Sequence, residues 1–466
     1  MDLPEDIWYL IATHLTPEEL RALIKVNRTF LHAALNARYR HVRFRSKSKK
    51  ELYDFTRLQD PFIASRVRVL SLVPTCFLPY PSHTPGPGII TKFIQAAKYF
   101  IWSDNPRVIG FGTPYGVAQK FDHIFGNLKF LDEVGLFCRD TWAVSPTART
   151  IVDSAWSSLG SNIHTLTLNM SSLALEQAVS SSLVFPKLEA LTFNTYRSYL
   201  STDADILQLL STILLPFVTN HRPTLRLFVL FDQGINDFDF SPLLHGLGFF
   251  PFLNHIDASI ALDKAAPSLW HFLGLHSNGL ENLGLSHCRL VEPPSYDGPA
   301  LAALKTLSLR LSVYTINFIT SLQRGNSIKS LKLHSFTYQH SEVSRILDVF
   351  AGHQLRSLYI GLDLLSPPTM NLISESFPNL HTLFLRIGSF TALGANKGDS
   401  SQVLEYLFCE LMGKKDYSHW QPPVFDLEVH KLSSTRCGDV LKKLFPQIRV
   451  EYFSVDCPIL DLKLPW

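Results

Sequence analysis

The sequence predicts an α/β fold in which a short N-terminal module of three helices precedes an irregular solenoid of strand–helix repeats. Three observations predict it. Apolar residues recur at helical spacing over the opening stretch, a short apolar phrase recurs at a fixed period from residue 163 onward, and Phe-Pro pairs precede several of its copies. In such a solenoid, parallel strands line the concave face and helices cover the convex face.

The opening residues predict three short amphipathic helices. Leu3-Pro4-Glu5-Asp6 starts the first, because proline fits the first turn and acidic side chains favour the positive end of the helix dipole. Thr16-Pro17-Glu18-Glu19 starts the second, where Thr16 and Glu19 can form a capping box. Asn27 can cap the third. A module this small has little core of its own, so we expect a protein partner to support it.

Residues 46–160 are expected to hold the first, atypical repeats, because the terminal repeats of a solenoid normally deviate from the rest. Val67–Leu72 and Leu128–Leu131 resemble degenerate copies of the apolar phrase. Between them, prolines from Pro74 to Pro87 predict a long irregular loop, and residues 89–102 are expected to form a helix.

The regular repeats are expected over residues 161–466, each starting with the phrase apolar-x-x-apolar-x-apolar. Its copies start roughly 24–28 residues apart with one longer gap, which lies within the period of leucine-rich repeats. The segments around 425–429 and 448–450 are expected to close the solenoid as a C-terminal cap. The nine clear copies start at Ile163, Leu188, Leu225, Leu253, Leu280, Leu304, Ile328, Leu355 and Leu380.

Phe-Pro pairs mark the same frame. Proline cannot continue a helix, so each pair is expected to end a helix and turn the chain into the next strand. The pairs are Phe185-Pro186, Phe250-Pro251, Phe377-Pro378 and Phe445-Pro446.

The composition favours a globular protein of the cytosol or nucleus. The chain has 466 residues, is 46% hydrophobic and carries a net charge of +3, which is too small to indicate a general nucleic-acid binder. Its six cysteines form no CxxC pair, and neither a signal peptide nor an apolar stretch of membrane-spanning length is evident. We therefore expect reduced thiols, no membrane and no nucleic-acid partner.

One local basic cluster has two interpretations. It is either a solvated helix end with its linker or a surface that steers an acidic partner. Its members are Arg38, Arg40, Arg43, Arg45, Lys47, Lys49 and Lys50.

The sequence indicates no catalytic chemistry. It contains no zinc-protease, serine-hydrolase or P-loop motif, and none of its eighteen histidines pairs with Cys, Asp or Glu at metal-ligand spacing. We expect a chain that is not an enzyme and that holds no cofactor and no metal.

The opening run resembles the F-box, although many members have tryptophan where Phe30 stands and cysteine or serine where Asn27 stands. The repeats resemble leucine-rich repeats, so the whole chain resembles an F-box protein with C-terminal leucine-rich repeats, of the fungal type, with the F-box at residues 1–45. The positions that match the F-box are Leu3, Pro4, Ile7, Ile11, Leu15, Leu20, Leu23, Val26 and Phe30.

This resemblance implies the substrate-recognition subunit of an SCF-type E3 ubiquitin ligase. The nine matching residues would then contact the Skp adaptor or form the core beneath that contact, and the adaptor would link the chain to a cullin with its RING subunit. Two alternatives are a binding scaffold that uses the adaptor outside ubiquitination, and a free-standing repeat protein that the opening helices merely cap.

The target, an unidentified protein, is expected on the C-terminal half of the concave face, where basic and aromatic side chains gather at alternate strand positions. Such a surface suits an acidic or phosphorylated segment. A merely solvated strand face is an equally weighted alternative. The candidate target-binding residues are Arg310, Lys332, His334, Tyr359, Phe384 and Arg386.

Overall fold

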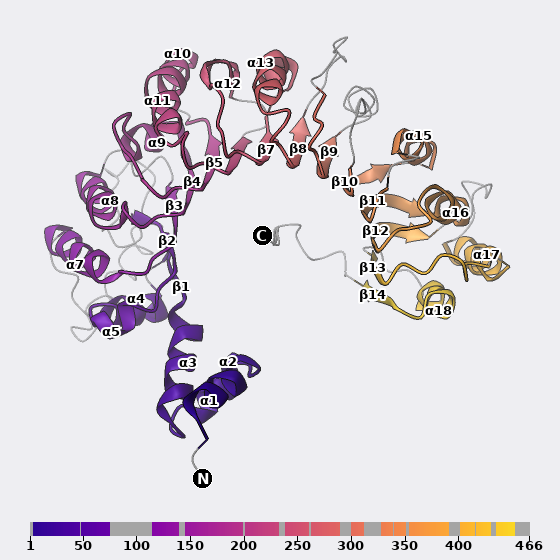
Figure 1. The fold of residues 1–466 in the computed structure, drawn as a ribbon, viewed down its shortest axis with the longest axis horizontal. Coiled ribbons are helices and arrows are strands. Elements are labelled where there is room, and N and C mark those ends of the chain that lie inside the picture. The colour runs from indigo at the N-terminus through magenta and orange to yellow at the C-terminus, as the bar shows by residue number, and fades with distance from the viewer. Residues whose placement is uncertain are drawn as a thin grey trace, which may run out of the picture. The chain divides into compact units, whose positions relative to one another are not determined.

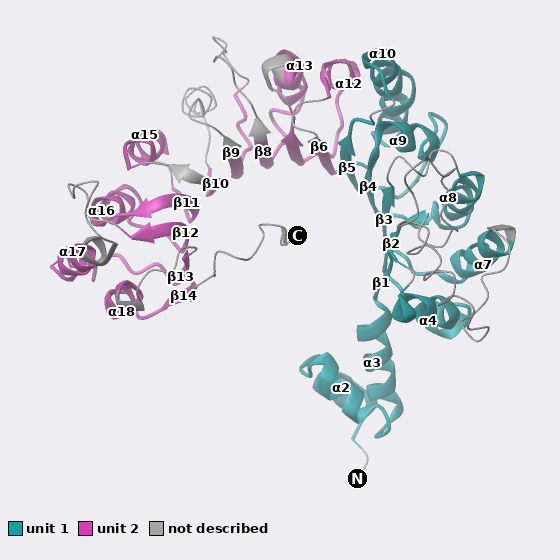
Figure 2. Ribbon diagram, turned by 180° about the vertical axis from the view of Figure 1, so that it is seen from behind, with its two compact units in different colours: residues 1–226, 232–235 teal, residues 227–231, 236–466 magenta. Residues whose placement is uncertain are grey.

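The structure is a computed structural model with two compact units, which Figure 2 distinguishes by colour. Unit 1 comprises residues 1–226 and 232–235, and unit 2 comprises residues 227–231 and 236–466. The predicted proline-rich loop after Pro74 and the predicted helix over 89–102 lie outside the described residues. The structure describes residues 3–46, 48–74, 114–138, 145–198, 201–232, 238–260, 262–288, 300–311, 328–338, 340–350, 354–390, 401–414, 416–429 and 435–452.

Unit 1 begins with three helices, as predicted: α1 (Glu5–Thr13), α2 (Pro17–Leu23) and α3 (Arg28–Tyr39). The Thr16 hydroxyl accepts from the N–H of Glu19 at 3.3 Å, and the Glu19 carboxylate accepts from the N–H of Thr16 at 2.8 Å. The capping box is therefore present. The Asn27 side chain caps α3 by accepting from the N–H of Phe30 at 2.9 Å.

Thr16→Ala is expected to destabilise α2 by about 1 kcal/mol, because the N–H of Glu19 loses its acceptor. Amide hydrogen exchange within α2 should become roughly fivefold faster, which is the ratio that this free energy gives. Glu18→Ala is the matched control, since Glu18 lies in the same first turn but makes no part of the box. Equal exchange rates in the two variants would contradict the prediction.

The five strands of unit 1 follow one another in chain order, and each pairs in parallel with the next. They are β1 (His41–Phe44), β2 (Val69–Leu72), β3 (Glu133–Cys138), β4 (Thr165–Ser171) and β5 (Ala190–Tyr196). Figure 1 shows the helices after α3 along one side of these strands. These helices are α4 (Lys49–Arg57), α5 (Pro61–Ala64), α7 (Pro114–Asn127), α8 (Pro146–Leu159), α9 (Ser172–Ala178), α10 (Asp203–Gln208), the π-helix η3 (Leu209–Leu214) and α11 (Leu215–Asn220).

Unit 2 repeats this arrangement with strands β6 to β14, again parallel and in chain order. The strands are β6 (Leu227–Asp232), β7 (His255–Ser259), β8 (Asn282–Cys288), β9 (Thr306–Leu311), β10 (Ser330–Tyr338), β11 (Ser357–Leu365), β12 (Thr382–Phe390), β13 (Val424–Val429) and β14 (Ile448–Tyr452). The helices on one side of them are α12 (Ser241–Gly246), α13 (Leu262–Leu275), α15 (His340–Phe350), α16 (Pro367–Ser376), α17 (Ser401–Gly413) and α18 (Thr435–Leu444).

The apolar phrase has the same role in each copy. Its last two apolar residues alternate along a strand and point to the helices, so Leu166 and Leu168 of β4 are fully buried, as are Leu383 and Leu385 of β12. All nine predicted copies lead into a strand, from β4 to β12, and the two predicted closing segments are β13 and β14. The α/β fold with parallel strands and helices on one side is therefore confirmed for each unit.

One early prediction needs correction. Leu128–Leu131 is not a strand but a turn after α7, and β3 starts only at Glu133. The phrase instead begins at Leu131, and its partners Val134 and Leu136 are buried in β3.

The sequence analysis also missed the first copy of the phrase. Tyr39, Val42 and Phe44 have its spacing and are all buried, and β1 pairs with β2. This copy was hidden because its first residue is the last residue of α3, so helical periodicity and the strand phrase overlap there.

The Phe-Pro pairs form one kind of turn. In each, the N–H three residues after the phenylalanine donates to the phenylalanine carbonyl, with N···O distances of 3.1 Å at Phe185, 3.3 Å at Phe250, 3.2 Å at Phe377 and 2.9 Å at Phe445. Every pair lies between a helix and the next strand, and α16 and α18 end directly before their pairs. The predicted turn into the next strand is confirmed for all four pairs, whereas the predicted helix end directly before the pair is present only at Phe377 and Phe445.

Two buried histidines hold two of these turns in the same way. Nε2 of His221 accepts from the N–H of Phe185 at 2.8 Å, and Nε2 of His276 accepts from the N–H of Phe250 at 2.9 Å. The Nδ1 atoms lie 2.7 and 2.8 Å from the carbonyl of a phenylalanine one turn earlier. Because Nε2 accepts and Nδ1 donates, both rings are neutral. Burial lowers the pKa of both imidazoles below the ordinary value.

These histidines make the fold sensitive to acid. Since their folded pKa values lie below the unfolded value of about 6.5, the unfolded chain binds protons first as the pH falls. The free energy of unfolding should be constant above pH 6.5 and decrease below it, by up to about 1.4 kcal/mol per pH unit for each histidine. Urea unfolding at pH 8, 7, 6 and 5 measures this slope. His221→Leu should reduce this slope, because one of the two buried imidazoles is then absent, and His245→Leu, at an exposed histidine, is the control.

Candidate functional site

Helices α1 to α3 enclose a small core. Ala12, Leu20 and Phe30 are buried in it, and Trp8 packs edge-on against Phe30 with ring centroids 5.5 Å apart. Each helix thus contributes one fully buried apolar side chain, which leaves the three-helix module with little stabilisation of its own. The side chains partly buried around this core also include Leu15, Leu23, Ala33 and Ala34.

Helix α1 carries a second apolar surface that this core does not use. Trp8 and Ala12 lie on the side of α1 that is turned to the core. Next to that side, further apolar residues follow Ile7 at spacings of three and four, so they lie together on the helix surface. A helix that is apolar on both sides is normally buried on both sides. We call the exposed set the α1 face; it consists of Leu3, Ile7, Leu10 and Ile11, which are 45%, 39%, 57% and 37% exposed.

A second exposed apolar group lies where α2 connects to α3. Ile24, Val26 and Leu31 are each more than a third exposed, with Val26 the most exposed at 58%. The N–H of Val26 donates to the carbonyl of Leu23 at 2.9 Å, which fixes the turn that presents it. The three-helix module thus exposes two groups of large apolar side chains, a feature of surfaces that can bind another protein.

The nine residues that match the F-box separate into three classes of burial. Leu3, Pro4, Ile7, Ile11 and Val26 are exposed, Leu15 and Leu23 are half-buried, and Leu20 and Phe30 are buried. Leu20 and Phe30 therefore form the core beneath the surface. Leu10 and Ile24 are exposed beside these residues but are not among the nine, although the spacing of Leu10 from Ile7 places it near the same face of the helix.

The second candidate surface is the open face of unit 2, by which we mean the strand face that points away from the helices. Three aromatic residues on neighbouring strands stack there. His334 of β10 and Tyr359 of β11 have ring centroids 4.9 Å apart, and Tyr359 and Phe384 of β12 lie 4.5 Å apart and nearly parallel, at 8°. The three side chains are half-buried. We call them the aromatic stack.

Hydrogen bonds and register hold this stack in place. Ser308 Oγ and His334 Nε2 are 3.0 Å apart, so β9 supports the ring from the next strand. Tyr359 and Phe384 are direct partners in the register of β11 and β12. Burial raises the pKa of the Tyr359 hydroxyl, although Arg386 nearby acts in the opposite direction.

The predicted basic residues are less available than the aromatic ones. Arg386 forms an ion pair with Glu428 at 3.1 Å, and both side chains are about a quarter exposed. The sequence analysis missed Glu428, although β13 was predicted and its register with β12 places Glu428 beside Arg386. Arg310 lies in β9 in register with Ser286, but its side chain is outside the described residues.

Lys332 is exposed and lies beside Tyr359 in the register. On the other side of Lys332, its register partner is Ser308 of β9. Gly284 of β8 and Asp257 of β7 follow in register on the next two strands. The Asp257 carboxylate extends over Gly284, where an added Cβ would lie 2.7 Å from its Oδ1 atom. Burial raises the pKa of the Asp257 carboxyl, whereas the positive charge of Lys332 lowers it. The two side chains therefore interact electrostatically. The open face is therefore aromatic and of mixed charge, rather than simply basic.

The described residues contain no group of three His, Cys, Asp or Glu side chains that could hold a metal ion. The side chains of Cys138, Cys409 and Cys437 are buried, and Cys409 and Cys437 Sγ are 3.5 Å apart. Within the same ranges, none of the helices combines the length and apolar character of a membrane span.

A scan of the sequence against protein-family models found no match, and a search among curated proteins found none at a significant level.

Proposed function

We propose that this chain is the substrate-recognition subunit of an SCF-type E3 ubiquitin ligase. In this proposal the three-helix module is an F-box that binds the Skp adaptor, the strand–helix repeats are irregular leucine-rich repeats, and the open face of unit 2 binds a target protein. The observation that carries the proposal is the exposed α1 face.

The energetics of the α1 face favour a protein partner. Fully burying one large aliphatic side chain is worth about 1.5–3 kcal/mol, so four of them can offset much of the cost of association. The module gains at the same time, because its own core buries only one side chain per helix. A partner that covers the α1 face therefore stabilises the module and anchors the chain.

The repeats support the second half of the proposal. Their period of roughly 24–28 residues and their strand–helix composition suit leucine-rich repeats. Strand faces of repeat proteins are extended and rigid, so they hold a bound protein without reactive groups of their own. The aromatic stack provides side chains of the types that dominate binding energy at such surfaces.

The proposed mechanism is proximity. The chain would hold a lysine of the target near the activated ubiquitin that the cullin and RING subunits deliver. Tethering two reactants in this way raises their effective concentration and needs no catalytic side chain on the receptor.

Co-expression of the full chain with a Skp adaptor tests the first step. We expect a stable complex that elutes as one species in size-exclusion chromatography, and a chain that elutes without the adaptor would overturn the proposal. The second step is tested by measuring the lifetime of captured proteins with and without the cullin. A complex whose captured proteins have unchanged lifetimes would instead indicate a scaffold that acts outside ubiquitination.

A further inference from the structure

Three residues of unit 1 lie side by side just before strands β1, β2 and β3. The carbonyl of Arg40 accepts from the N–H groups of Arg68 and Val69, both at 2.9 Å, and the carbonyl of Arg68 accepts from those of Asp132 and Glu133 at 2.9 and 3.0 Å. The backbone therefore brings Arg40, Arg68 and Asp132 to one edge of the sheet, although they are far apart in the sequence.

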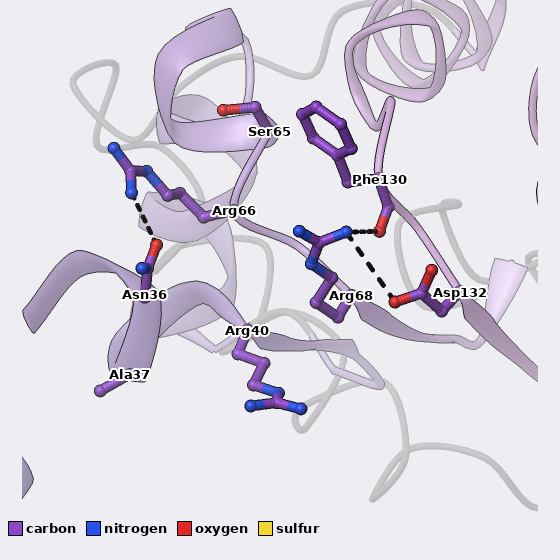
Figure 3. A pocket seen from close by; sticks show the side chains of 8 residues that line it. All are labelled: Asn36, Ala37, Arg40, Ser65, Arg66, Arg68, Phe130 and Asp132. Atoms are coloured by element: carbon purple, nitrogen blue, oxygen red, sulfur yellow. Dashed lines mark hydrogen bonds and ion pairs between the residues drawn. The ribbon is translucent and has the colours of Figure 1, made fainter. Parts of the chain in front are cut away.

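A hollow of about 510 Å³ opens at this edge, as Figure 3 shows. Its lining includes three arginines, Arg40, Arg66 and Arg68, and one acid, Asp132. Its formal charge is therefore positive. Asn36 and Phe130 also line it, and Phe130 is 52% exposed. We call this the arginine hollow.

The protein neutralises these arginines only in part. Arg68 donates to the Phe130 carbonyl at 2.8 Å, but its distance to the Asp132 carboxylate is 3.9 Å, too long for a hydrogen bond. Arg66 donates to the Asn36 side chain at 2.6 Å, while its Nε atom is buried without a hydrogen-bond partner. Arg40 is exposed, and its guanidinium group makes no hydrogen bond or ion pair with any residue that the structure describes.

We propose that the arginine hollow is a binding site for a phosphomonoester, either the phosphorylated side chain of a polypeptide or a small phosphorylated molecule. A dianion would offset the excess charge of the lining, and its three terminal oxygens would accept from guanidinium groups that approach from different elements. The Asn36 amide would add a neutral donor, and the exposed Phe130 ring would contact the part of the ligand next to the phosphate.

This site is distinct from the surfaces that carry the proposed function. All of its residues belong to unit 1, and none of them is part of the α1 face or the aromatic stack. Of the basic cluster predicted from the sequence, Arg40 lines the hollow and the other members that the structure describes do not. Arg38 pairs with Asp54 at 3.2 Å and Arg45 lies on the Phe137 ring at 4.5 Å, whereas Arg40 is one of the residues that line the hollow.

Calorimetric titration of the full chain tests the proposal. The probes are inorganic phosphate, a phosphoserine peptide and the same peptide without phosphate, at pH 7.5 and constant ionic strength. We expect phosphate and the phosphopeptide to bind and the unmodified peptide not to bind. A phosphopeptide that binds much more tightly than phosphate would identify a polypeptide ligand, and equal affinities would identify a small molecule.

Arg40→Gln is the decisive variant, because Arg40 has no structural partner to lose. It should weaken phosphate binding at least tenfold and leave the unfolding temperature unchanged. Arg43→Gln is the matched control, since Arg43 is an exposed arginine of β1 outside the hollow, and its affinity should equal that of the unmodified chain. Absence of phosphate binding, or an equal loss in both variants, would overturn the proposal.

Discussion

Replacing Ile7 and Leu10 together by glutamate is expected to abolish binding of the Skp adaptor without unfolding the chain. Both side chains belong to the α1 face and are exposed, so glutamate is tolerated in the free protein. In the complex the two carboxylates would be buried without partners, and the apolar contact would be lost as well. Together these effects exceed about 3 kcal/mol, so calorimetric titration should show at least a 100-fold weaker affinity.

Leu207→Glu is the matched control for this variant. Leu207 lies on α10 and is 52% exposed, so its replacement adds one glutamate at a similarly exposed apolar position away from the module. Its adaptor affinity should equal that of the unmodified chain. If the double variant of the α1 face also binds normally, the adaptor does not use this surface and the F-box proposal fails.

Local signals account for most of the fold that the sequence predicts. Thr16, Glu19 and Asn27 act within one helical turn, so their caps can be identified without knowledge of the tertiary structure. The strand phrase is equally local, because two alternate apolar residues determine which side of a strand is buried. It failed at β1, where its first residue, Tyr39, also completes a helix, and before β3, where the copy that starts at Leu131 was placed three residues too early.

Side-chain partners across strands could not be predicted in the same way. Arg386 and Glu428 are 42 positions apart in the sequence, and only the register of β12 with β13 makes them an ion pair. The sequence therefore suggested a basic surface where the structure has a partly neutralised one. Arg40, Arg66 and Arg68 were even harder to group, because the end of α3, the turn after α5 and the start of β2 bring them to one hollow.

The sequence also could not predict which apolar residues of the three-helix module are buried. Helical spacing shows that α1 has too many apolar positions for one face, but not which of them the core uses. The structure decides this because Trp8 packs against Phe30, which directs Ala12 inward and leaves Ile7 outside. The exposed α1 face is therefore a consequence of which side of α1 the small core occupies.

Replacing Tyr359 and Phe384 together by alanine is expected to abolish target capture. The two rings form the centre of the aromatic stack, and buried aromatic side chains at a binding surface commonly contribute 2 kcal/mol or more each. Their joint loss should weaken target binding at least 100-fold. Charge reversal at Arg386 would be a poorer test, because it would place two acids side by side at Glu428.

The measurement is quantitative affinity capture from cells. It is made with the chain that carries Ile7→Glu and Leu10→Glu, because a chain that does not bind the adaptor should not cause degradation of the targets it binds. The proteins captured by this background should disappear when Tyr359 and Phe384 are alanine, but remain when the exposed Phe252 and Tyr406 are alanine instead. Tyr359→Phe should retain them, because the stack needs the ring and not the hydroxyl. Since half-buried rings also contribute to stability, the unfolding temperature of each variant is measured alongside. An unchanged set of captured proteins in a folded double-alanine variant would show that the target binds elsewhere.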